Sequence, residues 1–280
     1  MKITAHTLVK NEERYLWYAV MSIIDHIDEI LLWDTGSTDN TIKIIQDLKK
    51  RYPSKVKVKL LGDVDIQEFT KVRQKMLEET ESDWVFILDG DEVWWRDKIE
   101  ETTHLMRTKP ELQTIVSEYR NLIGDIFHYQ DEKASFYKID DKTGPYTVRA
   151  MSMKNIKGLN VSKPHGTQGF FDGQGKLVQE LTKSKRQWVT GVSYLHFTHL
   201  IRSSNLESDK KVIKRNIKYK HELGHSFDLN FYYPEAFFLT RPSFVQNVWV
   251  KADKKYLLRA KIETPLRKMK RLLFTHKSGY

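Results

Sequence analysis

The chain has 280 residues, 40% of them hydrophobic, so it can bury a substantial core and is not a disordered chain. It contains no cysteine, which excludes disulfides, thiolate metal sites and a cysteine nucleophile, and which fits a cytoplasmic protein. The formal net charge of +10 favours anionic partners, namely nucleotide phosphates, nucleic acid or an acidic membrane surface. No apolar run reaches the roughly 20 residues that cross a bilayer, and residues 1–6 lack the apolar stretch of a signal peptide.

The first part of the chain alternates short apolar segments with segments of helical spacing. Strands are expected at 2–9, 29–33, 55–61 and 83–88, and helices at 11–24, 41–50 and 67–80. Strands that alternate with helices predict a parallel sheet with helices on both faces. In such sheets ligands bind at the carboxyl ends of the strands. Polar and acidic clusters follow Val9, Trp33 and Leu88, so we expect a binding site at this edge of the sheet.

The pattern changes from about residue 110 onward. Short strand-like pieces are expected at 113–119, 147–153 and 188–196, with a glycine-rich stretch over 166–175. After Ser203 the chain has helical spacing over 210–223 and 251–274, and both segments are rich in lysine and arginine. Pro265 is expected to break or kink the second of these helices.

Three carboxylates, Asp89, Asp91 and Glu92, follow a strand that reads as buried on both faces. Residues two apart on an extended backbone face the same side, so Asp89 and Asp91 can address one cation. Magnesium and manganese prefer such oxygen ligands and keep positions open for phosphates. Clustered carboxylates also repel one another unless a cation or hydrogen-bond donors compensate them. We therefore favour a metal site here over a solvated acidic turn.

Two other polar segments are less specific. Asp34 follows the second strand, where it could hold a ribose or a base, and Ser37 or Thr38 could cap the next helix. By themselves, these residues favour an ordinary capped turn. The polar residues at 8–14 are expected to open the first helix, where exposed N–H groups attract anions, although Glu12 and Glu13 could merely complement the helix dipole.

Three segments carry a family resemblance: LVKNEERYL, DEILLWDTGSTDNT and WVFILDGDE. In this order and spacing they resemble glycosyltransferase family 2 of the GT-A, or nucleotide-diphospho-sugar transferase, fold. The resemblance covers residues 1–95. It implies an α/β fold with a Rossmann-like, mostly parallel sheet, helices on both faces and a helical C-terminal region. It further implies a nucleotide-diphospho-sugar donor, Mn²⁺ or Mg²⁺ as cofactor, and transfer of the sugar to a hydroxyl group with inversion.

The resemblance also implies positions for donor-binding residues. Thr7, Asn11 and Glu12 would lie at the nucleotide, and Asp34 near the base or the ribose. The segment FTKVRQ resembles the family segment whose arginine reaches the nucleotide, which indicates Arg73.

Other residues would bind the metal or the sugar. Asp89 and Asp91 match the DxD motif of the family, which bridges metal, ribose and diphosphate. His196 follows an apolar strand, where relatives often place a histidine that completes the metal shell; a structural histidine is the alternative. Trp94 and Trp95 could stack on a sugar ring, although aromatic residues more often belong to the core.

The catalytic base is the least defined element of the site. An inverting transfer needs a carboxylate that deprotonates the acceptor. Many relatives carry a His-Glu pair where this chain has His165 and Gly166, so the expected glutamate is missing. Asp172 is the replacement candidate and Glu180 the next, and either could instead be plain surface charge.

One motif points to a different chemistry. The segment HELGH, residues 221–225, satisfies the H-E-x-x-H pattern of zinc proteases. Asp228 and Phe231 stand where a longer metzincin pattern has glycine and histidine. We therefore interpret the match as a coincidence and zinc-protease activity as a minor alternative.

These expectations combine into one organisation. The GT-A catalytic domain would span 1–200, with the nucleotide-sugar and metal half at 1–95 and the acceptor half at 96–200, and a helical basic region would follow at 201–280. The acceptor could be a saccharide, a lipid-linked molecule or a protein. The basic segment 251–277 interleaves apolar residues and could lie on an anionic membrane face, which would make a cytoplasmic protein peripheral at the membrane, or it could be a solvated helix.

Two further function classes compete with sugar transfer. A nucleotidyltransferase would usually show a glycine-rich phosphate loop near the N-terminus, which the segment HTLVKNEE lacks. A nucleic-acid-binding protein is suggested by the charge alone, and the acidic clusters at the strand ends oppose it. We therefore expect no nucleic-acid partner.

Overall fold

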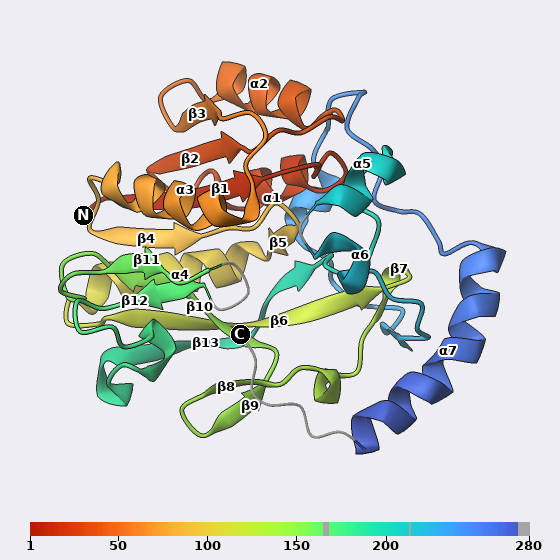
Figure 1. The fold of residues 1–280 in the computed structure, drawn as a ribbon. Helices are drawn as coiled ribbons and strands as arrows, with labels where there is room; N and C mark the ends of the chain where they lie inside the picture. Colours follow the sequence, from red (N-terminus) through yellow and green to blue (C-terminus); the bar gives the residue numbers. More distant parts are fainter. Residues whose placement is uncertain (165–167, 213, 274–280) are drawn as a thin grey trace.

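The computed structural model describes residues 1–164, 168–212 and 214–273 and shows an α/β fold around a ten-stranded sheet (Figure 1). Four neighbouring strands run parallel in the order β3, β2, β1, β4. They are β1 (Ile3–Val9), β2 (Glu29–Asp34), β3 (Val56–Leu60) and β4 (Trp84–Ile87). The parallel sheet expected for the first part of the chain is confirmed.

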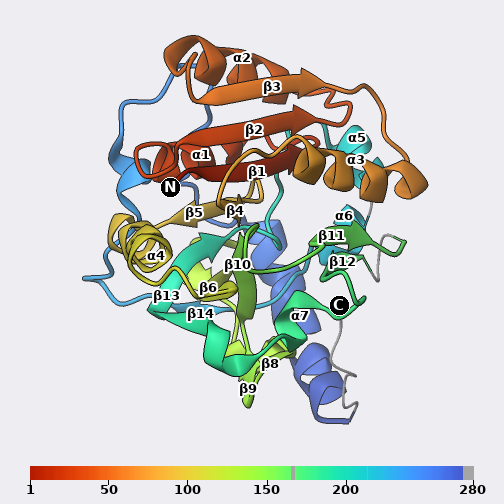
Figure 2. The ribbon, with the colours of Figure 1, turned by 90° about the vertical axis from the view of Figure 1, so that its left-hand side faces the viewer.

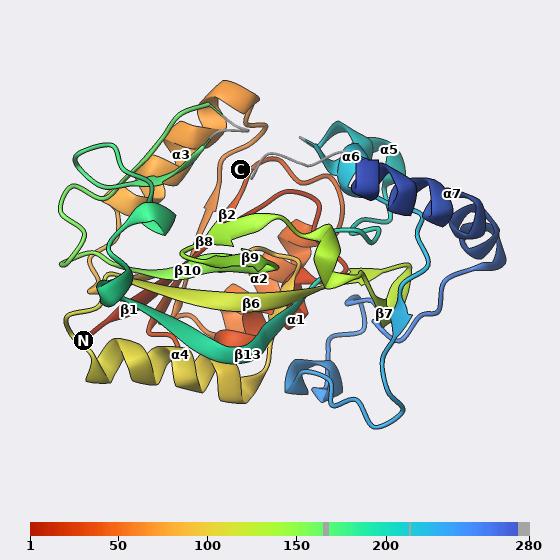
Figure 3. The ribbon, with the colours of Figure 1, turned by 90° about the horizontal axis from the view of Figure 1, so that it is seen from below.

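Helices cover both faces of this sheet (Figure 3). They are α1 (Leu16–Ile23), α2 (Thr41–Arg51), α3 (Ile66–Glu78) and α4 (Arg96–Thr108). Side chains alternate between the two faces along a strand. In β4, Phe86 therefore packs in the core with α1, α2 and α4, whereas Val85 and Ile87 pack with Leu77 of α3 on the opposite face. The expected two-sided α/β architecture is confirmed.

Two details of these helices differ from expectation. The first helix begins at Leu16 rather than at residue 11. Asn11 has a left-handed backbone with φ 55°, which asparagine tolerates but a helix does not. Neither Ser37 nor Thr38 caps α2, whose N-cap is Asn40. The segments after β1 and β2 are therefore loops that bond to each other rather than helix openings.

The second half of the chain continues the sheet mainly with antiparallel strands. The added strands are β5 (Glu92–Trp94), β6 (Thr114–Ile123), β7 (Asp125–Tyr129), β10 (Tyr146–Ser152), β13 (Arg186–His196) and β14 (His225–Ser226). β10 pairs with β4 on one side and β6 on the other, and β13 runs parallel to β6. The parallel arrangement is thus confined to the N-terminal strands and the β6–β13 pair.

Two hairpins stand outside the sheet, together with short 3₁₀ turns. The hairpins pair β8 (Tyr137–Ile139) with β9 (Lys142–Gly144), and β11 (Asn160–Ser162) with β12 (Gly169–Phe171). The turns are η1 (Glu132–Ala134), η2 (Val178–Glu180), η3 (Lys183–Lys185) and η4 (Glu235–Phe238). β11 lies against α3, where Val161 N–H donates to Gln74 Oε1 at 2.7 Å (Figure 2).

The chain after residue 200 contains less helix than expected. Its helices are α5 (Leu206–Lys211), α6 (Arg215–Lys218) and α7 (Lys254–Leu273). The single helix expected over 210–223 is wrong, because α5 ends at Lys211, α6 covers only Arg215–Lys218, and residues 219–224 are irregular. The expected break at Pro265 is also absent, because α7 continues through this residue. Proline has no N–H to donate to the carbonyl four residues earlier. This side of the helix is exposed, so water can bond to that carbonyl instead.

Part of this region belongs to the core of the first half. Phe237 and Val248 pack in the same hydrophobic cluster as α1. The hydroxyl of Tyr18 in α1 donates to the carbonyl of Gln246 at 2.9 Å. No helix among the described residues is both long and apolar enough to span a membrane.

Candidate active site

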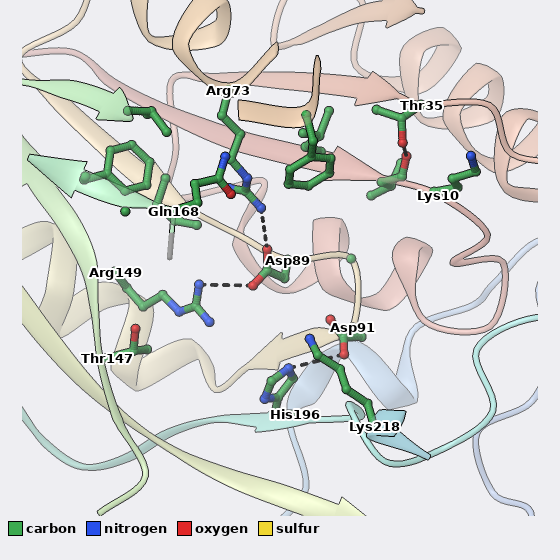
Figure 4. Close-up of a pocket in the computed structure, with 18 of the residues that line it drawn as sticks. Lys10, Thr35, Arg73, Asp89, Asp91, Thr147, Arg149, Gln168, His196 and Lys218 are labelled. Atoms are coloured by element: carbon green, nitrogen blue, oxygen red, sulfur yellow. Dashed lines mark hydrogen bonds and ion pairs between the residues drawn. The ribbon is translucent and has the colours of Figure 1, made fainter. Parts of the chain in front are cut away.

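A cavity of about 1310 Å³ lies at the carboxyl ends of β1, β2 and β4 (Figure 4). Loops that follow these strands line it with Asn11 and Glu12, with Thr35 and Gly36, and with Asp89 and Asp91. The structure therefore brings together the three polar clusters that the sequence places at strand ends. The opposite wall comes from the second half of the chain and includes Tyr119, Tyr137, Tyr146, Arg149, Glu180 and His196.

Two arginines bind Asp89, the more exposed of the two paired aspartates. Arg149 Nη1 lies 3.3 Å from Asp89 Oδ2, and Arg73 Nη2 lies 3.5 Å from Oδ1 (Figure 4). Burial alone would raise the pKa of Asp89, but Arg149 and Arg73 hold it below its ordinary value. Arg149 also forms an ion pair with Glu92, which is fully buried. Asp89 is thus ionised at neutral pH and already has two cationic partners.

Asp91 is buried beside a histidine and a third arginine. Arg202 Nη1 lies 2.9 Å from Asp91 Oδ2, and His196 Nε2 lies 3.2 Å from the same oxygen. Burial opposes ionisation of Asp91, but Arg202 and His196 outweigh it and hold its pKa far below the ordinary value. Burial lowers the pKa of His196, so this imidazole is neutral at neutral pH. Its Nδ1 atom is buried without a hydrogen-bond partner among the described residues.

Glu12 extends the same network to the loop after β1. Arg202 Nη1 and Arg215 Nη2 lie 2.8 and 2.7 Å from Glu12 Oε1. Burial raises the pKa of Glu12 to about 7 against the effect of both arginines. The second carboxylate oxygen, Oε2, is buried and has no hydrogen-bond partner within the described part of the chain.

The cations that hold these carboxylates come mostly from sequence positions that showed no motif. Arg149 lies on β10, whereas Arg202, Arg215 and Lys218 belong to the segment after β13. The repulsion expected among the clustered carboxylates is therefore relieved by arginine side chains of the protein itself. Sequence reasoning missed Arg149 because it had no signal in the sequence. It missed the others because their only signal was a basic composition after residue 200, which does not reveal that they face the acidic loop.

The fit of a divalent cation depends on Asp91 and His196. Among the described residues, no group of three or more histidine or acidic side chains is arranged around a common metal position. Asp91 Oδ2 and His196 Nε2 are 3.2 Å apart, close enough to bind one ion together. One carboxylate and one imidazole leave several positions of an octahedral ion for phosphate oxygens and water. This mixed oxygen and nitrogen pair suits Mn²⁺ at least as well as Mg²⁺.

Comparison with known protein families shows which family this chain belongs to. The family model described as Glycosyl transferase family 2 matches residues 4–166, more than half of the chain. The chain belongs to glycosyltransferase family 2. This match confirms the resemblance noted in the N-terminal motifs.

Curated relatives of this glycosyltransferase match parts of it. Glycosyltransferase SunS of Bacillus phage SPbeta is 28% identical over 95 residues, which are 34% of this chain and 21% of that protein. An uncharacterized glycosyltransferase of Rickettsia felis is 24% identical over 155 residues, 55% of this chain and 50% of that protein. The glycosyltransferase described here thus covers half or less of each relative.

Two solved structures illustrate a partial similarity of fold. S. aureus TarS 1–349 has a TM-score of 0.47 at 15% identity, over 71% of this chain and 61% of that chain. Glucosyl-3-phosphoglycerate synthase from Mycobacterium tuberculosis, in complex with Mn²⁺ and uridine-diphosphate-glucose, has a TM-score of 0.43 at 18% identity, over 69% and 70%.

In this glycosyltransferase, six of the residues expected at the donor or the metal line the cavity: Asn11, Glu12, Arg73, Asp89, Asp91 and His196. Two others lie behind its wall. Asp34 is buried, and its Oδ1 accepts the N–H groups of Gly36 and Ser37, both at 2.9 Å. Thr7 is fully buried in β1. The carboxylate of Asp34 thus holds the loop after β2 in shape, and direct contact of Asp34 or Thr7 with a nucleotide stays a prediction.

The glycines of the site explain how its loops approach each other. Gly36 has φ 90°, and a Cβ atom there would lie 2.9 Å from the backbone of Asp63. A Cβ atom at Gly90 would lie 2.9 Å from Val9 Cγ1 and 3.1 Å from Glu12 Cγ. Glycine at these positions therefore lets the loop after β2 approach the segment after β3, and lets the loop after β4 approach the end of β1.

The two candidate bases occupy different places. Asp172 does not line the described part of the cavity; its Oδ1 accepts the N–H groups of Gln174 and Lys176 at 3.0 and 2.9 Å and closes the turn after β12. Glu180, at the end of η2, is exposed and lines the cavity. The positions of His165 and Gly166 lie outside the described residues. The geometry therefore favours Glu180 over Asp172.

The tryptophan pair is not a sugar platform. Trp94 is fully buried and stacks on Tyr194 with ring centroids 4.9 Å apart. Trp95 is also buried, and its Nε1–H donates to the carbonyl of Tyr232 at 3.0 Å. The structure therefore supports the alternative that both rings belong to the core: Trp94 ends β5, and Trp95 is the N-cap residue of α4.

The HELGH segment does not have the geometry of a zinc-protease site. Its residues do not form the helix on which that motif depends. The carboxylate of Glu222 binds both Nη atoms of Arg271 at 2.6 Å, and His221 lies 3.9 Å from Glu263. Glu222 thus serves as an anchor for α7.

Proposed function

We propose that this glycosyltransferase moves a sugar from a nucleotide-diphospho-sugar to an acceptor hydroxyl, with a divalent cation at Asp91 and His196. The observation that carries the proposal is the 3.2 Å approach of Asp91 Oδ2 and His196 Nε2 inside a cavity walled by arginines. A diphosphate group bears two or more negative charges, and this cavity provides both a place for a cation and fixed positive charges around it.

The nucleoside would occupy the part of the cavity beside β1, β2 and α3. Asn11, Thr35, Thr38 and Asp65 line it with groups that can bond a base or a ribose. The loop that carries them is already braced: Thr38 N–H donates to Asn11 Oδ1 at 2.8 Å. A preorganised loop loses little entropy when a ligand binds.

The diphosphate would lie between Asp91 and the basic segment 202–218. Lys218 reaches toward Asp91 and His196 (Figure 4), and burial together with Arg202 lowers its pKa. An ammonium group in such a place is stabilised by a bound anion. Arg215 holds the carbonyl oxygen of Lys10 at 3.0 Å and thus fixes the loop beneath the phosphates. The bound metal would neutralise charge on the leaving diphosphate.

The acceptor would enter from the wall formed by Tyr137, Tyr146 and Glu180. For an inverting transfer, Glu180 would take the proton of the acceptor hydroxyl while the oxygen of that hydroxyl bonds to the anomeric carbon. The bond from that carbon to the diphosphate then breaks on the opposite face, and the nucleoside diphosphate leaves. A saccharide, a lipid-linked molecule or a protein side chain could provide this hydroxyl.

A thermal-shift panel tests the proposal, because a ligand that binds the folded state raises the melting temperature. Nucleoside diphosphates and nucleotide sugars are each measured with Mn²⁺, with Mg²⁺ and with a chelator. We expect at least one nucleotide to stabilise the protein, and more strongly with Mn²⁺. Asp91→Asn should lose the cation-dependent part, and Asp47→Asn in α2, where Asp47 pairs with Arg51, should keep it. Absence of a shift with every nucleotide would overturn the proposal.

A further inference from the structure

The helix α7 turns most of its large apolar side chains toward solvent, whereas a surface helix of a water-soluble domain usually turns them toward the protein. It runs along the periphery of the molecule, outside α6 and β7 (Figures 1 and 3). Its buried residues, Tyr256, Ala260 and Thr264, are spaced by four and face the protein. The side chains exposed on the other side are Leu258, Ile262, Leu266, Met269, Leu272 and Leu273, each between 53% and 86% exposed.

Polar contacts hold the inner face of α7 in place. Tyr256 Oη lies 3.1 Å from the carbonyl oxygens of Lys220 and Glu222. Leu223 N–H donates to Thr264 Oγ1 at 2.8 Å. Arg271, fifteen residues after Tyr256, binds the buried carboxylate of Glu222 through both Nη atoms. A helix fixed along its length by such contacts keeps its other face turned outward.

The outer face forms one continuous apolar stripe. Leu258, Ile262, Leu266, Met269 and Leu273 follow one another at intervals of three or four residues, so they line up along the helix. Single exposed apolar residues are ordinary on protein surfaces, but a contiguous stripe marks an interaction site. With 20 residues, the helix is about 30 Å long.

Basic residues border the stripe on both sides. Lys254, Lys261 and Lys268 are seven residues apart and therefore form a row along one edge, and Arg259 and Lys270 lie along the other. The helix has eight lysines and arginines and a single glutamate. Within the part of the chain that the structure describes, none of the three lysines in the row forms an ion pair, so their charges are available to a partner.

This combination selects an anionic lipid surface among the possible partners. A second copy of the chain would bring two rows of lysines together, and like charges repel. A nucleic acid would bind the charges but would leave the aliphatic stripe in water. At a bilayer surface the aliphatic side chains enter the acyl region, while flanking lysines extend to the head groups.

We propose that α7 docks the protein on an anionic membrane surface, with the stripe Leu258 to Leu273 inserted below the head groups and the lysine row on the lipid phosphates. The helix lies in the plane of the interface and does not cross the bilayer. This inference depends only on the geometry of α7 and is independent of which donor the enzyme uses.

Vesicle co-sedimentation tests the proposal with the full chain. The protein is mixed with vesicles of phosphatidylcholine alone or of phosphatidylcholine and phosphatidylglycerol in equal parts, at low and high salt. We expect binding to the anionic vesicles that weakens as salt increases. Equal binding to both kinds of vesicle, or to neither, would overturn the proposal.

Two variants separate the apolar and the electrostatic contributions. Ile262→Ser/Leu266→Ser/Met269→Ser removes the centre of the stripe, and Lys254→Glu/Lys261→Glu/Lys268→Glu reverses the row. Each should weaken binding at least about tenfold, with unchanged circular dichroism and unchanged stabilisation by nucleotides, because the substituted side chains are exposed.

Matched controls carry the same changes elsewhere on the surface. Leu229→Ser/Phe238→Ser/Val250→Ser removes exposed apolar residues outside α7, and Lys50→Glu/Lys57→Glu/Lys71→Glu makes the same change of charge. Both should bind anionic vesicles as the unchanged protein does. If the lysine control loses binding equally, the net charge of the protein and not α7 causes the binding; if the apolar control does, exposed apolar surface in general causes it. Either result contradicts the proposal. If the protein instead dimerises without lipid and the stripe variant is monomeric, a second copy covers the stripe, and the proposal is wrong.

Discussion

Arg202 Nη1 lies 2.9 Å from Asp91 Oδ2, which joins the segment after β13 to the acidic loop after β4. The same nitrogen lies 2.8 Å from Glu12 Oε1 in the loop after β1. One guanidinium group therefore connects three segments that are distant in sequence, and it fixes the site before any ligand arrives. Such preorganised charge is what a reaction with a charged leaving group requires.

Replacement of this arginine should destabilise the protein. Arg202→Met leaves Asp91 buried beside Glu12 with less cationic compensation, which costs about 3–5 kcal/mol for a buried pair. Urea unfolding measures the loss. Arg51→Met is the control, since Arg51 pairs with Asp47 on the surface of α2, and loss of such a pair costs less than about 1 kcal/mol. Equal stability of the two variants would show that the network around Arg202 carries no net stabilisation.

Asp91→Asn should reduce the rate of metal-dependent sugar transfer by a factor on the order of 10² or more. The amide keeps the shape of the side chain but removes the charge that a cation would bind beside His196. Turnover of a nucleotide sugar at several Mn²⁺ concentrations provides the measurement, and a cooperative thermal transition shows that the fold is intact. Near-normal turnover that still requires Mn²⁺ would remove Asp91 from the metal site.

The two candidate bases can be compared directly. Glu180→Gln should leave donor binding nearly unchanged and reduce transfer by about 10²–10⁴-fold, the usual contribution of a general base. Asp172→Asn should change neither quantity by much, because its carboxylate accepts hydrogen bonds within the turn after β12. Saturation kinetics separates the two effects. A large loss of turnover in Asp172→Asn alone would return the role to Asp172.

His6 should make the fold sensitive to acid. Burial, with a smaller effect of Arg73, lowers its pKa from 6.5 to about 3, so the folded protein keeps this imidazole neutral where the unfolded chain protonates it. Stability present above pH 6.5 is therefore lost as the pH falls toward 3, by roughly 4 kcal/mol from this group.

The free energy of unfolding measured between pH 7 and pH 4 checks this dependence. His6→Gln keeps a polar side chain beside Thr80, whose Oγ1 lies 2.6 Å from His6 Nε2. This variant should show a shallower loss of stability with acid. A slope identical to that of the unchanged protein would assign the acid sensitivity to other groups.

The sequence by itself determined the N-terminal architecture and the acidic end of the site. Alternating apolar segments predicted β1 to β4 and the helices between them, because the periodicity of a strand or a helix is a local property. Parallel strands present their carboxyl ends at one edge, so the motifs after Val9, Trp33 and Leu88 were predicted to converge. Asn11, Glu12, Asp89 and Asp91 line one cavity as a result.

Only the tertiary structure decided what surrounds these residues. Arg149 and Arg202 come from antiparallel and irregular segments without a motif, so their approach to the carboxylates depends on long-range packing. Packing also placed Trp94 in the core and turned the carboxylate of Asp172 into its own loop. The orientation of α7 could not be predicted from the sequence either, because a helical period shows which residues share a face but not which face packs against the protein. Tyr256 and Arg271 decide that question through contacts with a segment more than thirty residues earlier in the chain.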